Sequence, residues 1–346
     1  MVTIKDVAKM ANVSPSTVSR VIADHKHISA ETKERVRKVM KELGYHPNVI
    51  ARSLIKRSSQ ALGLVLSRST ESAFSNPFFP EILRGISTVT QSHHYSLVLA
   101  AAENYQEEAK QYLRMLMEKR VDGVIILASR VNDELIQRLA EEEYPFVVVG
   151  RAQGIKEYTS VNNDNIQAAY LAVRHLLNLG NQRIAFLNGP EEYTFCQDRF
   201  QGYCMALREY GIEVNGDYVR NAENLQEDGY RLTKELMSIE PRPHALFAAD
   251  DLMAIGAYRA LKEEGLSIPD DVAVIGFNDN YLAAFMEPPL TTVRIPIYEM
   301  GVVAAQLIFH ILQNKEACAQ QRILSSQLIV RESCGAKRKF PELAGK

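Results

Sequence analysis

Short apolar runs alternate with stretches of helical periodicity through most of the chain. The runs cover residues 62–66, 96–100, 121–127, 146–150, 183–187, 245–249 and 272–277. Near-continuous apolar runs spaced by roughly 20–30 residues are typical of parallel sheets covered by helices on both faces. A break near 160–165 separates two sets of runs, and a further apolar helix is expected at 297–312. The pattern predicts an α/β body of two doubly wound lobes, with a cleft between the carboxyl ends of their strands.

The first 45 residues follow a different pattern, that of three short helices. Apolar residues recur at helical spacing at positions 4, 7, 8 and 11. Ser14 can cap a second helix, Pro15–Ile22, and Ser29 can cap a third that ends at Gly44. Two short helices joined by a tight turn and closed by a third form a helix-turn-helix.

The second of these helices carries small and hydroxylated side chains on its exposed face. Arg20 can bond guanine through two hydrogen bonds, and Ser16 can bond a base as donor or acceptor. The hydroxyls better suited to phosphates are those of Ser14, Thr17, Ser19 and the N-terminal Thr3. The alternative is a small amphipathic bundle whose basic face is merely solvated.

The charge of the chain is unevenly distributed. The net charge is −2, yet residues 1–60 hold twelve Lys and Arg against five Asp and Glu, an excess of +7 that leaves −9 for the rest. A basic head on an acidic body is the layout of a nucleic-acid reader with a separate sensing part.

The head also resembles a known family. The segments IKDVAKMANVSPSTVSRVI and ISAETKERVRKVMKELGYHPNVIARSL are similar to the DNA-binding head of the LacI/GalR family of bacterial transcription regulators, without a break from about residue 3 to 54. The resemblance implies a helix-turn-helix domain at 1–46. It places Pro15, Ser16 and Arg20 at base-reading positions and His27 near the DNA backbone.

Residues 47–60 then correspond to the family's hinge. The resemblance implies a helix at Asn48–Leu54 that forms only on operator DNA, with Asn48 as its cap and Ala51 small enough to approach the groove floor. Leu54 resembles the leucine that intercalates in the minor groove. A stretch this short is not stable as an isolated helix, so its folding would need DNA and a partner hinge. The alternative is an ordinary interdomain linker.

The resemblance extends over about residues 1–335. It rests on NPFFPEILRGI, GNQRIAFLNGP, DRFQGY, DDLMAIGAYRAL, IPDDVAVIGFND and PPLTTVRIPIYEMG. It implies a two-lobed body like periplasmic sugar-binding proteins, crossed three times by the chain. We expect an effector-binding and dimerisation domain at 61–335. Its expected divisions are an N-lobe of 61–161 and 293–323, a C-lobe of 162–290 and 324–335, and a short tail of 336–346.

Family equivalences place loop-end residues in the cleft, where they would bind a small sugar. These candidate effector contacts are Phe78, Asn104, Asp164, Phe195, Arg199, Asp250 and Asn278. Side chains that can each form two hydrogen bonds, mixed with aromatic faces, suit a polyhydroxylated ligand. Each has an alternative: Asp250 could cap the following helix, and Phe78 could belong to the core. Many family members have Asp and Asn exchanged between positions 278 and 250, which affects any sugar specificity inferred from them.

The implied function is a sequence-specific repressor of a carbohydrate-utilisation operon. The partners expected are double-stranded operator DNA, a sugar effector and a second copy of the chain, with dimer contacts on helices after 77 and near 250–287. MVTIKDVAK, RVDGVIIL and VNNDN are most similar to maltose-operon repressors of Gram-positive bacteria, which implies maltose or a maltodextrin. A second regulator type, catabolite control by a phosphorylated carrier protein, is the alternative. The tail has no leucine heptad, so no coiled-coil tetramer is expected.

Other functional classes lack their sequence signatures. The chain has no GxxxxGK[ST], GxSxG or HExxH segment and no CxxC pair among its four cysteines, so we expect neither an enzyme nor a metal site nor a cofactor. No apolar h-region or membrane-length run is present, which favours a cytoplasmic protein without membrane association and disfavours an exported transport receptor.

Overall fold

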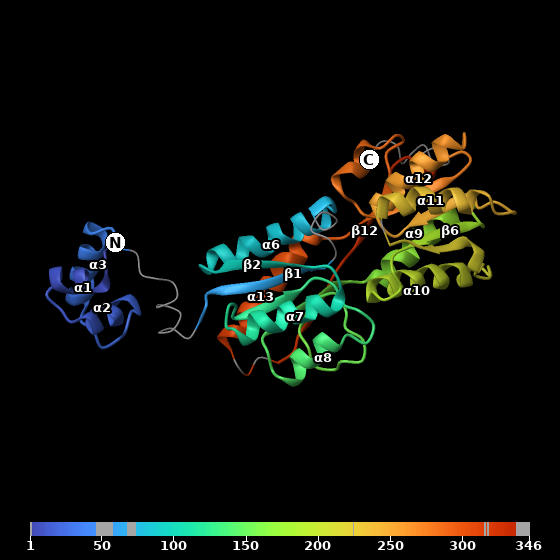
Figure 1. The fold of residues 1–346 in the computed structure, drawn as a ribbon. Coiled ribbons are helices and arrows are strands. Elements are labelled where there is room, and N and C mark those ends of the chain that lie inside the picture. Colours follow the sequence, from blue (N-terminus) through green and yellow to red (C-terminus); the bar gives the residue numbers. More distant parts are fainter. Residues whose placement is uncertain are drawn as a thin grey trace.

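The computed structural model describes residues 2–45, 58–67, 74–223, 225–314, 316 and 318–336. Within these residues the chain forms a small helical head and a larger body of two α/β lobes (Figure 1).

The head consists of three helices, α1 (Ile4–Met10), α2 (Pro15–Ile22) and α3 (Ala30–Glu42). The side chains of Ser14 and Ser29 cap α2 and α3, as the sequence predicts. A separate apolar core joins the helices: Val7, Ala8, Ala11, Val18, Val21, Val36 and Val39. The head therefore buries its own hydrophobic residues.

The first lobe is built on a parallel sheet of order β11-β5-β4-β3-β1-β2. Its strands are β1 (Ala61–Ser67), β2 (Ser96–Ala102), β3 (Gly123–Ile126), β4 (Phe146–Val149), β5 (Ser160–Asn163) and β11 (Gln321–Leu324). Its helices are α6 (Phe78–Ser92), α7 (Tyr105–Met117), α8 (Glu134–Glu141) and α13 (Ile297–Gln313). Successive residues of each strand point to opposite faces of the sheet. Those on one face pack in a hydrophobic cluster with α6 and α13, and those on the other face pack with α7 and α8.

The second lobe is built on a sheet of order β12-β10-β9-β8-β6-β7, parallel except for β12. Its strands are β6 (Ile184–Asn188), β7 (Val219–Asn221), β8 (Ala245–Ala248), β9 (Ala273–Asn278), β10 (Thr291–Arg294) and β12 (Gln327–Ile329). Its helices are α9 (Asn165–Asn178), α10 (Thr194–Glu209), α11 (Leu225–Met237) and α12 (Asp251–Glu263), with 3-10 turns η1 (Gly216–Tyr218) and η2 (Tyr281–Phe285).

The chain crosses between the lobes after β5, after β10 and after β11. These positions differ slightly from the expected boundaries. Asn162 and Asn163 pair with the first sheet, as does Leu324, although all were expected in the C-lobe. Val293 and Arg294, expected in the N-lobe, pair with β9 of the second sheet. The reason is that each crossing strand keeps its backbone hydrogen bonds to the edge of its own sheet.

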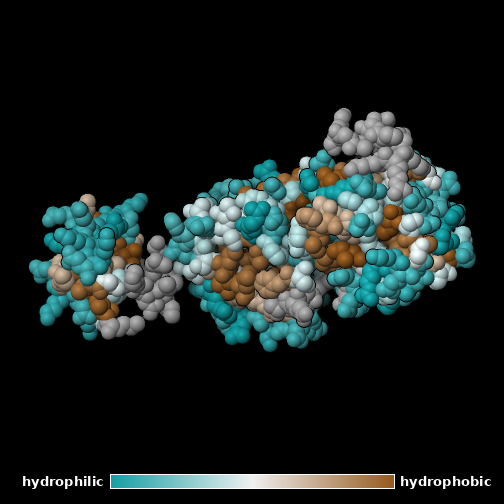
Figure 2. Space-filling view, turned by 90° about the horizontal axis from the view of Figure 1, so that it is seen from above, coloured by the Kyte–Doolittle hydropathy of each residue, from teal (hydrophilic) through white to brown (hydrophobic). Residues whose placement is uncertain are grey.

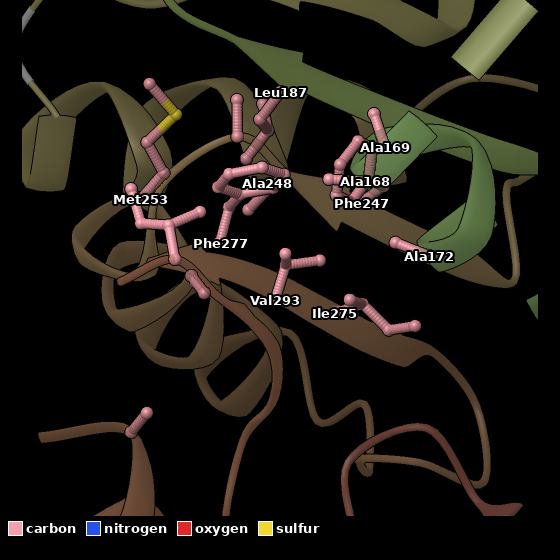
Figure 3. Packing of buried hydrophobic residues seen from close by; sticks show 14 of the residues in the cluster. Ala168, Ala169, Ala172, Leu187, Phe247, Ala248, Met253, Ile275, Phe277 and Val293 are labelled. Carbon is pink, nitrogen blue, oxygen red and sulfur yellow. The ribbon is translucent and has the colours of Figure 1, made fainter. Parts of the chain in front are cut away.

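Large aromatic residues form the centre of the second lobe. Phe186 stacks on Phe247 with ring centroids 5.0 Å apart, and both are fully buried. Figure 3 shows the small residues Ala168 and Ala169 of α9 beside Phe247, while Met253 lies with Ala248 on the other side. Close packing of both helix layers fixes the carboxyl ends of β8 and β9, where the candidate effector residues lie.

The described residues contain no disulfide, and none of their helices has the length and apolar character needed to cross a bilayer.

Candidate functional site

The N-terminus of α2 presents a cluster of hydroxyls to solvent. Ser14 Oγ accepts a hydrogen bond from Thr17 N at 3.1 Å and lies 2.7 Å from Ser16 Oγ. Ser14, Pro15 and Ser16 are exposed, and Thr17 and Ser19 are half-buried. Free backbone N–H groups and hydroxyls at a helix N-terminus can bind phosphate oxygens.

Arg20 lies exposed towards the other end of α2 and forms no ion pair with any residue the structure describes. It is therefore available to a base edge. His27 is also exposed. Thr3, in contrast, donates its hydroxyl to Asp6 Oδ2 at 2.7 Å, and the same oxygen accepts from Thr3 N at 2.8 Å at the start of α1. The hinge candidates Asn48, Ala51 and Leu54 lie outside the described residues.

In the second lobe Arg199 is held in a buried position on α10. Its Nε donates to Asn165 Oδ1 at 3.0 Å and its Nη1 to the carbonyl of Ala249 at 2.6 Å. The guanidinium lies 3.8 Å from the ring centroid of Phe277 and 5.0 Å from that of Phe195. Burial lowers the pKa of Arg199 below its usual value. Two aromatic faces and two oxygen acceptors fix the orientation of this cation.

Asp250 and Asn278 meet at the carboxyl ends of β8 and β9. Asp250 Oδ1 accepts from Leu252 N and so caps α12, and its Oδ2 accepts from Asn278 Nδ2, both at 2.8 Å. The predicted cap and the predicted site residue are thus the same side chain. Asn278 is 9% exposed, adopts a φ of 106° and has a buried Oδ1 without a hydrogen-bond partner. A buried acceptor without a donor is unfavourable, so a ligand hydroxyl would stabilise it.

The two lobes also contact each other directly, through a clasp formed by residues 129–131 of the first lobe and 192–194 of the second. Its hydrogen bonds join Val131 N to Glu192 O at 2.8 Å, Thr194 N to Ser129 O at 3.1 Å, and the hydroxyls of Ser129 and Thr194 at 2.8 Å. These contacts join the two lobes directly.

Arg130 strengthens the clasp. It pairs with the buried Glu108 at 2.8 Å within its own lobe and donates to Tyr193 Oη of the second lobe at 3.2 Å. A second cross-lobe pair joins Arg151 to Asp198 at 2.6 Å, and this hydrogen bond raises the pKa of Arg151. The sequence patterns gave no signal for either pair, because they depend on how two distant loops meet.

The remaining candidates lie at separate positions. Phe78 is half-buried at the start of α6 and packs edge-on against Phe79. Asn104 and Asp164 are exposed and cap α7 and α9 through their side-chain oxygens. The structure therefore brings together Phe195, Arg199, Asp250 and Asn278 with two residues that the sequence did not indicate, Asn165 and Phe277. In the described part of the chain, no cluster of His, Cys, Asp and Glu could hold a metal ion.

Comparison with known proteins matches both parts of the chain to family models. Residues 59–332 match the periplasmic binding proteins and sugar binding domain of the LacI family, and residues 3–48 match the bacterial regulatory proteins of the lacI family. The transcriptional regulator MalR of Streptococcus pneumoniae is 38% identical over 93% of this chain and 97% of its own length.

Solved structures of regulators from the same family are also similar to this chain. A crystal structure of the lac repressor dimer bound to operator and the anti-inducer ONPF has a TM-score of 0.84 and 27% identity, covering 96% of this chain and 99% of that one. A transcriptional regulator CelR–cellobiose complex has a TM-score of 0.75 and 33% identity, covering 96% and 100%. Because one family model spans most of the body and another the head, the chain belongs to the LacI family of bacterial proteins, which are transcriptional regulators and not enzymes.

Proposed function

We propose that this protein acts in the cytoplasm as a homodimeric repressor of a carbohydrate-utilisation operon, and that a sugar bound between its lobes lowers its affinity for the operator. Maltose or a maltodextrin is the proposed effector. In this proposal residues 1–46 read DNA, 47–60 form the hinge, and 61–335 bind the effector and the second copy.

The observation that carries the proposal is the unpartnered Oδ1 of Asn278 beside Asp250 and the buried Arg199. A sugar hydroxyl can donate to the Asn278 oxygen and accept from a neighbouring donor at the same time. The ring of Phe195 adds an apolar face, which suits the C–H side of a pyranose. Phe78, Asn104 and Asp164 are proposed as weaker contacts at the rim, because two of them already cap helices.

The clasp supports the proposal that closure of the two lobes changes the affinity for the operator. It joins the lobes through groups on both sides of the cleft, so a ligand that binds both lobes favours the arrangement in which the clasp is formed. A ligand changes operator affinity only if it binds one arrangement more tightly than the other.

For the head we propose that Pro15, Ser16 and Arg20 contact base edges, while Thr3, Ser14, Thr17, Ser19 and His27 contact the backbone. The hinge would add Asn48, Ala51 and Leu54 in the minor groove. The exposure of Ser16 and Arg20 along one helix supports this division.

A second copy is proposed to pack on α6 and the segment 250–287. Tyr281 and Phe285 of η2 are 69% and 82% exposed. Figure 2 views the body from the side of α6 and shows hydrophobic residues gathered over both lobes. Exposed apolar surface of this kind marks protein–protein contacts.

The test is a thermal-shift screen of maltose, maltotriose, cellobiose, ribose and glucose on the full chain. A ligand that binds only the native state raises the unfolding temperature. We expect maltose or maltotriose to do so, and to release a duplex selected from random DNA by the protein. Arg199→Ala should abolish the shift and the release but keep duplex binding. A chain that binds no duplex selectively would overturn the proposal, and binding raised only by a phosphorylated carrier protein would replace it with catabolite control.

A further inference from the structure

Two pairs of neighbouring residues, Asp250–Asp251 and Asn278–Asp279, lie at the carboxyl ends of β8 and β9. The first members of the pairs bond each other in the candidate effector site. The second members turn away from it towards β10, the strand that leads out of the second lobe. Asp251 Oδ1 accepts from Thr292 Oγ1 at 2.6 Å, and Asp279 N donates to the same hydroxyl at 3.3 Å.

Asp279 differs from Asp251 in that the donors to its carboxylate are charged. Its side chain is 6% exposed and lies between two arginines. Arg294 Nε donates to its Oδ2 and Arg331 Nη2 to its Oδ1, both at 2.7 Å. Charge-assisted bonds of this length are the strong kind, and each arginine occupies a different oxygen.

These two arginines lie on or just after β10 and β12, the two second-lobe strands that adjoin the second and third crossings. Arg294 is the last residue of β10, three positions before α13 begins at Ile297 in the first lobe. Arg331 follows β12, the first strand after the third crossing, and its Nη1 also donates to the carbonyl of Leu290 just before β10. A single carboxylate therefore joins the end of β10 that leads into the second crossing to the segment after β12, which lies at the end of that antiparallel strand away from the third crossing.

The backbone links this carboxylate to the effector site. Asn278 and Asp279 both have positive φ, 106° and 54°, and Asn278 is held in register with Arg294 across β9 and β10. Asn278 and Asp279 share one planar peptide unit, so a ligand that changes the backbone angles of Asn278 also changes the direction in which Asp279 presents its side chain.

We propose that Asp279 is a positioning residue that transmits occupancy at Asn278, through Arg294 and Arg331, to β10 and β12, the second-lobe strands that adjoin the second and third crossings. This inference rests on the proposed function, in which lobe closure controls operator affinity. Asp279 itself needs no contact with the ligand.

The first test uses the ligand-free full chain. Asp279→Asn removes the charge but keeps the shape, and Asn tolerates a positive φ well. The matched control is Asp228→Asn, which breaks a 2.9 Å ion pair with Arg231 on α11 of the same lobe. Hydrogen exchange should rise in Asp279→Asn at the first turn of α13 and in β11, both in the other lobe, and should stay unchanged there in the control. A rise confined to the second lobe overturns the proposal.

The second test measures the coupling between effector binding and operator binding, with maltose as the effector and the selected duplex as the operator. Asp279→Asn should bind maltose within about threefold of the wild type, while the ratio of operator affinities without and with maltose falls at least roughly fivefold towards one. General destabilisation would instead weaken both affinities together. Asp279→Glu, which keeps the charge, should restore the ratio. An unchanged ratio in Asp279→Asn overturns the proposal.

A milder variant guards against loss of folding. The side chain of Arg294 is 54% exposed, so Arg294→Gln removes one anchor without leaving a deeply buried charge unpaired. Arg294→Gln should change both hydrogen exchange in the first lobe and the ratio of operator affinities in the same direction as Asp279→Asn, but by a smaller amount. If the wild type does not respond to maltose, the proposed effector is wrong, and the exchange experiment still decides the role of Asp279.

Discussion

The neighbouring acids Asp250 and Asp251 have different surroundings although they are adjacent in sequence. Asp250 caps α12 and bonds Asn278, whereas Asp251 is fully buried beneath Gly276, where an added Cβ would lie 2.2 Å from its Oδ1. The family resemblance placed Asp250 in the effector site and gave Asp251 no role. The residue pattern alone could not separate two adjacent acids, because the direction in which each points depends on the rotation of α12.

Burial raises the pKa of Asp251 well above its usual value, and the bonds from Thr292 and Asn280 oppose this only in part. The folded chain therefore holds a proton that the unfolded chain releases near pH ~4. The contribution of this group to stability falls as the pH rises from that value towards the folded pKa. We predict that Asp251→Asn gains stability relative to the wild type as the pH is raised, by up to about 1.4 kcal/mol per pH unit within that window.

Thermal unfolding of both proteins between pH 4 and pH 8 measures this effect. Asp271→Asn is the control, because hydrogen bonds from Ser267 lower the pKa of the exposed Asp271. Its carboxylate stabilises the fold above its usual pKa and loses that effect as the pH falls, which is the opposite dependence. Parallel profiles for the wild type and Asp251→Asn would contradict the prediction.

Arg20 gives a second prediction at the residue scale. Because it is exposed on α2, Arg20→Ala should leave the head folded, lose about 1–3 kcal/mol of operator binding and relax base preference at one position. Binding to a set of single-base variants of the selected duplex measures this. An equal loss on every sequence would assign Arg20 to a phosphate instead.

At the scale of elements, the buried strands and the head helices could be predicted from the sequence, because both have strong periodicity. The predicted second helix, Pro15–Ile22, is confirmed with its serine cap. The runs did not indicate β5, β7, β10, β11 and β12, which carry polar residues and lie at or near sheet edges. Strands of this kind gain their stability from pairing rather than from apolar side chains.

Glycines set how closely the paired helices approach. A Cβ on Gly256 of α12 would lie 2.1 Å from the carbonyl oxygen of Gln226 on α11, whereas one on Gly216 would meet nothing within 4 Å. Gly256→Ala should therefore force α11 and α12 apart and destabilise the chain by about 1–3 kcal/mol. Gly216→Ala, the control, should be close to neutral. Equal unfolding temperatures for both variants would show that the helix pair can adjust.

For the whole molecule, the sequence indicated two lobes and a cleft but not how the lobes meet. The family resemblance placed Arg199, Asp250 and Asn278 at loop ends beyond strands, where ligands of open α/β sheets bind. The clasp could not, because Arg130 and Tyr193 are brought together only when the lobes fold and close. Contacts between separately folded units leave no periodic pattern in either one.

The clasp leads to the last prediction. Tyr193→Phe removes the hydroxyl that Arg130 reaches across the cleft and keeps the ring. A hydrogen bond of this kind contributes about 0.5–1.5 kcal/mol, so the closed arrangement should become less populated and the affinity for the effector should fall by roughly two- to twelvefold. Tyr203→Phe is the matched control, because that hydroxyl bonds the Ile184 carbonyl within one lobe. Calorimetric titration with the sugar identified by the screen should show a weaker complex for Tyr193→Phe alone. Equal affinities in the two variants would mean that the ligand closes the lobes without help from the clasp, and closure would then have to depend on contacts made by the sugar itself.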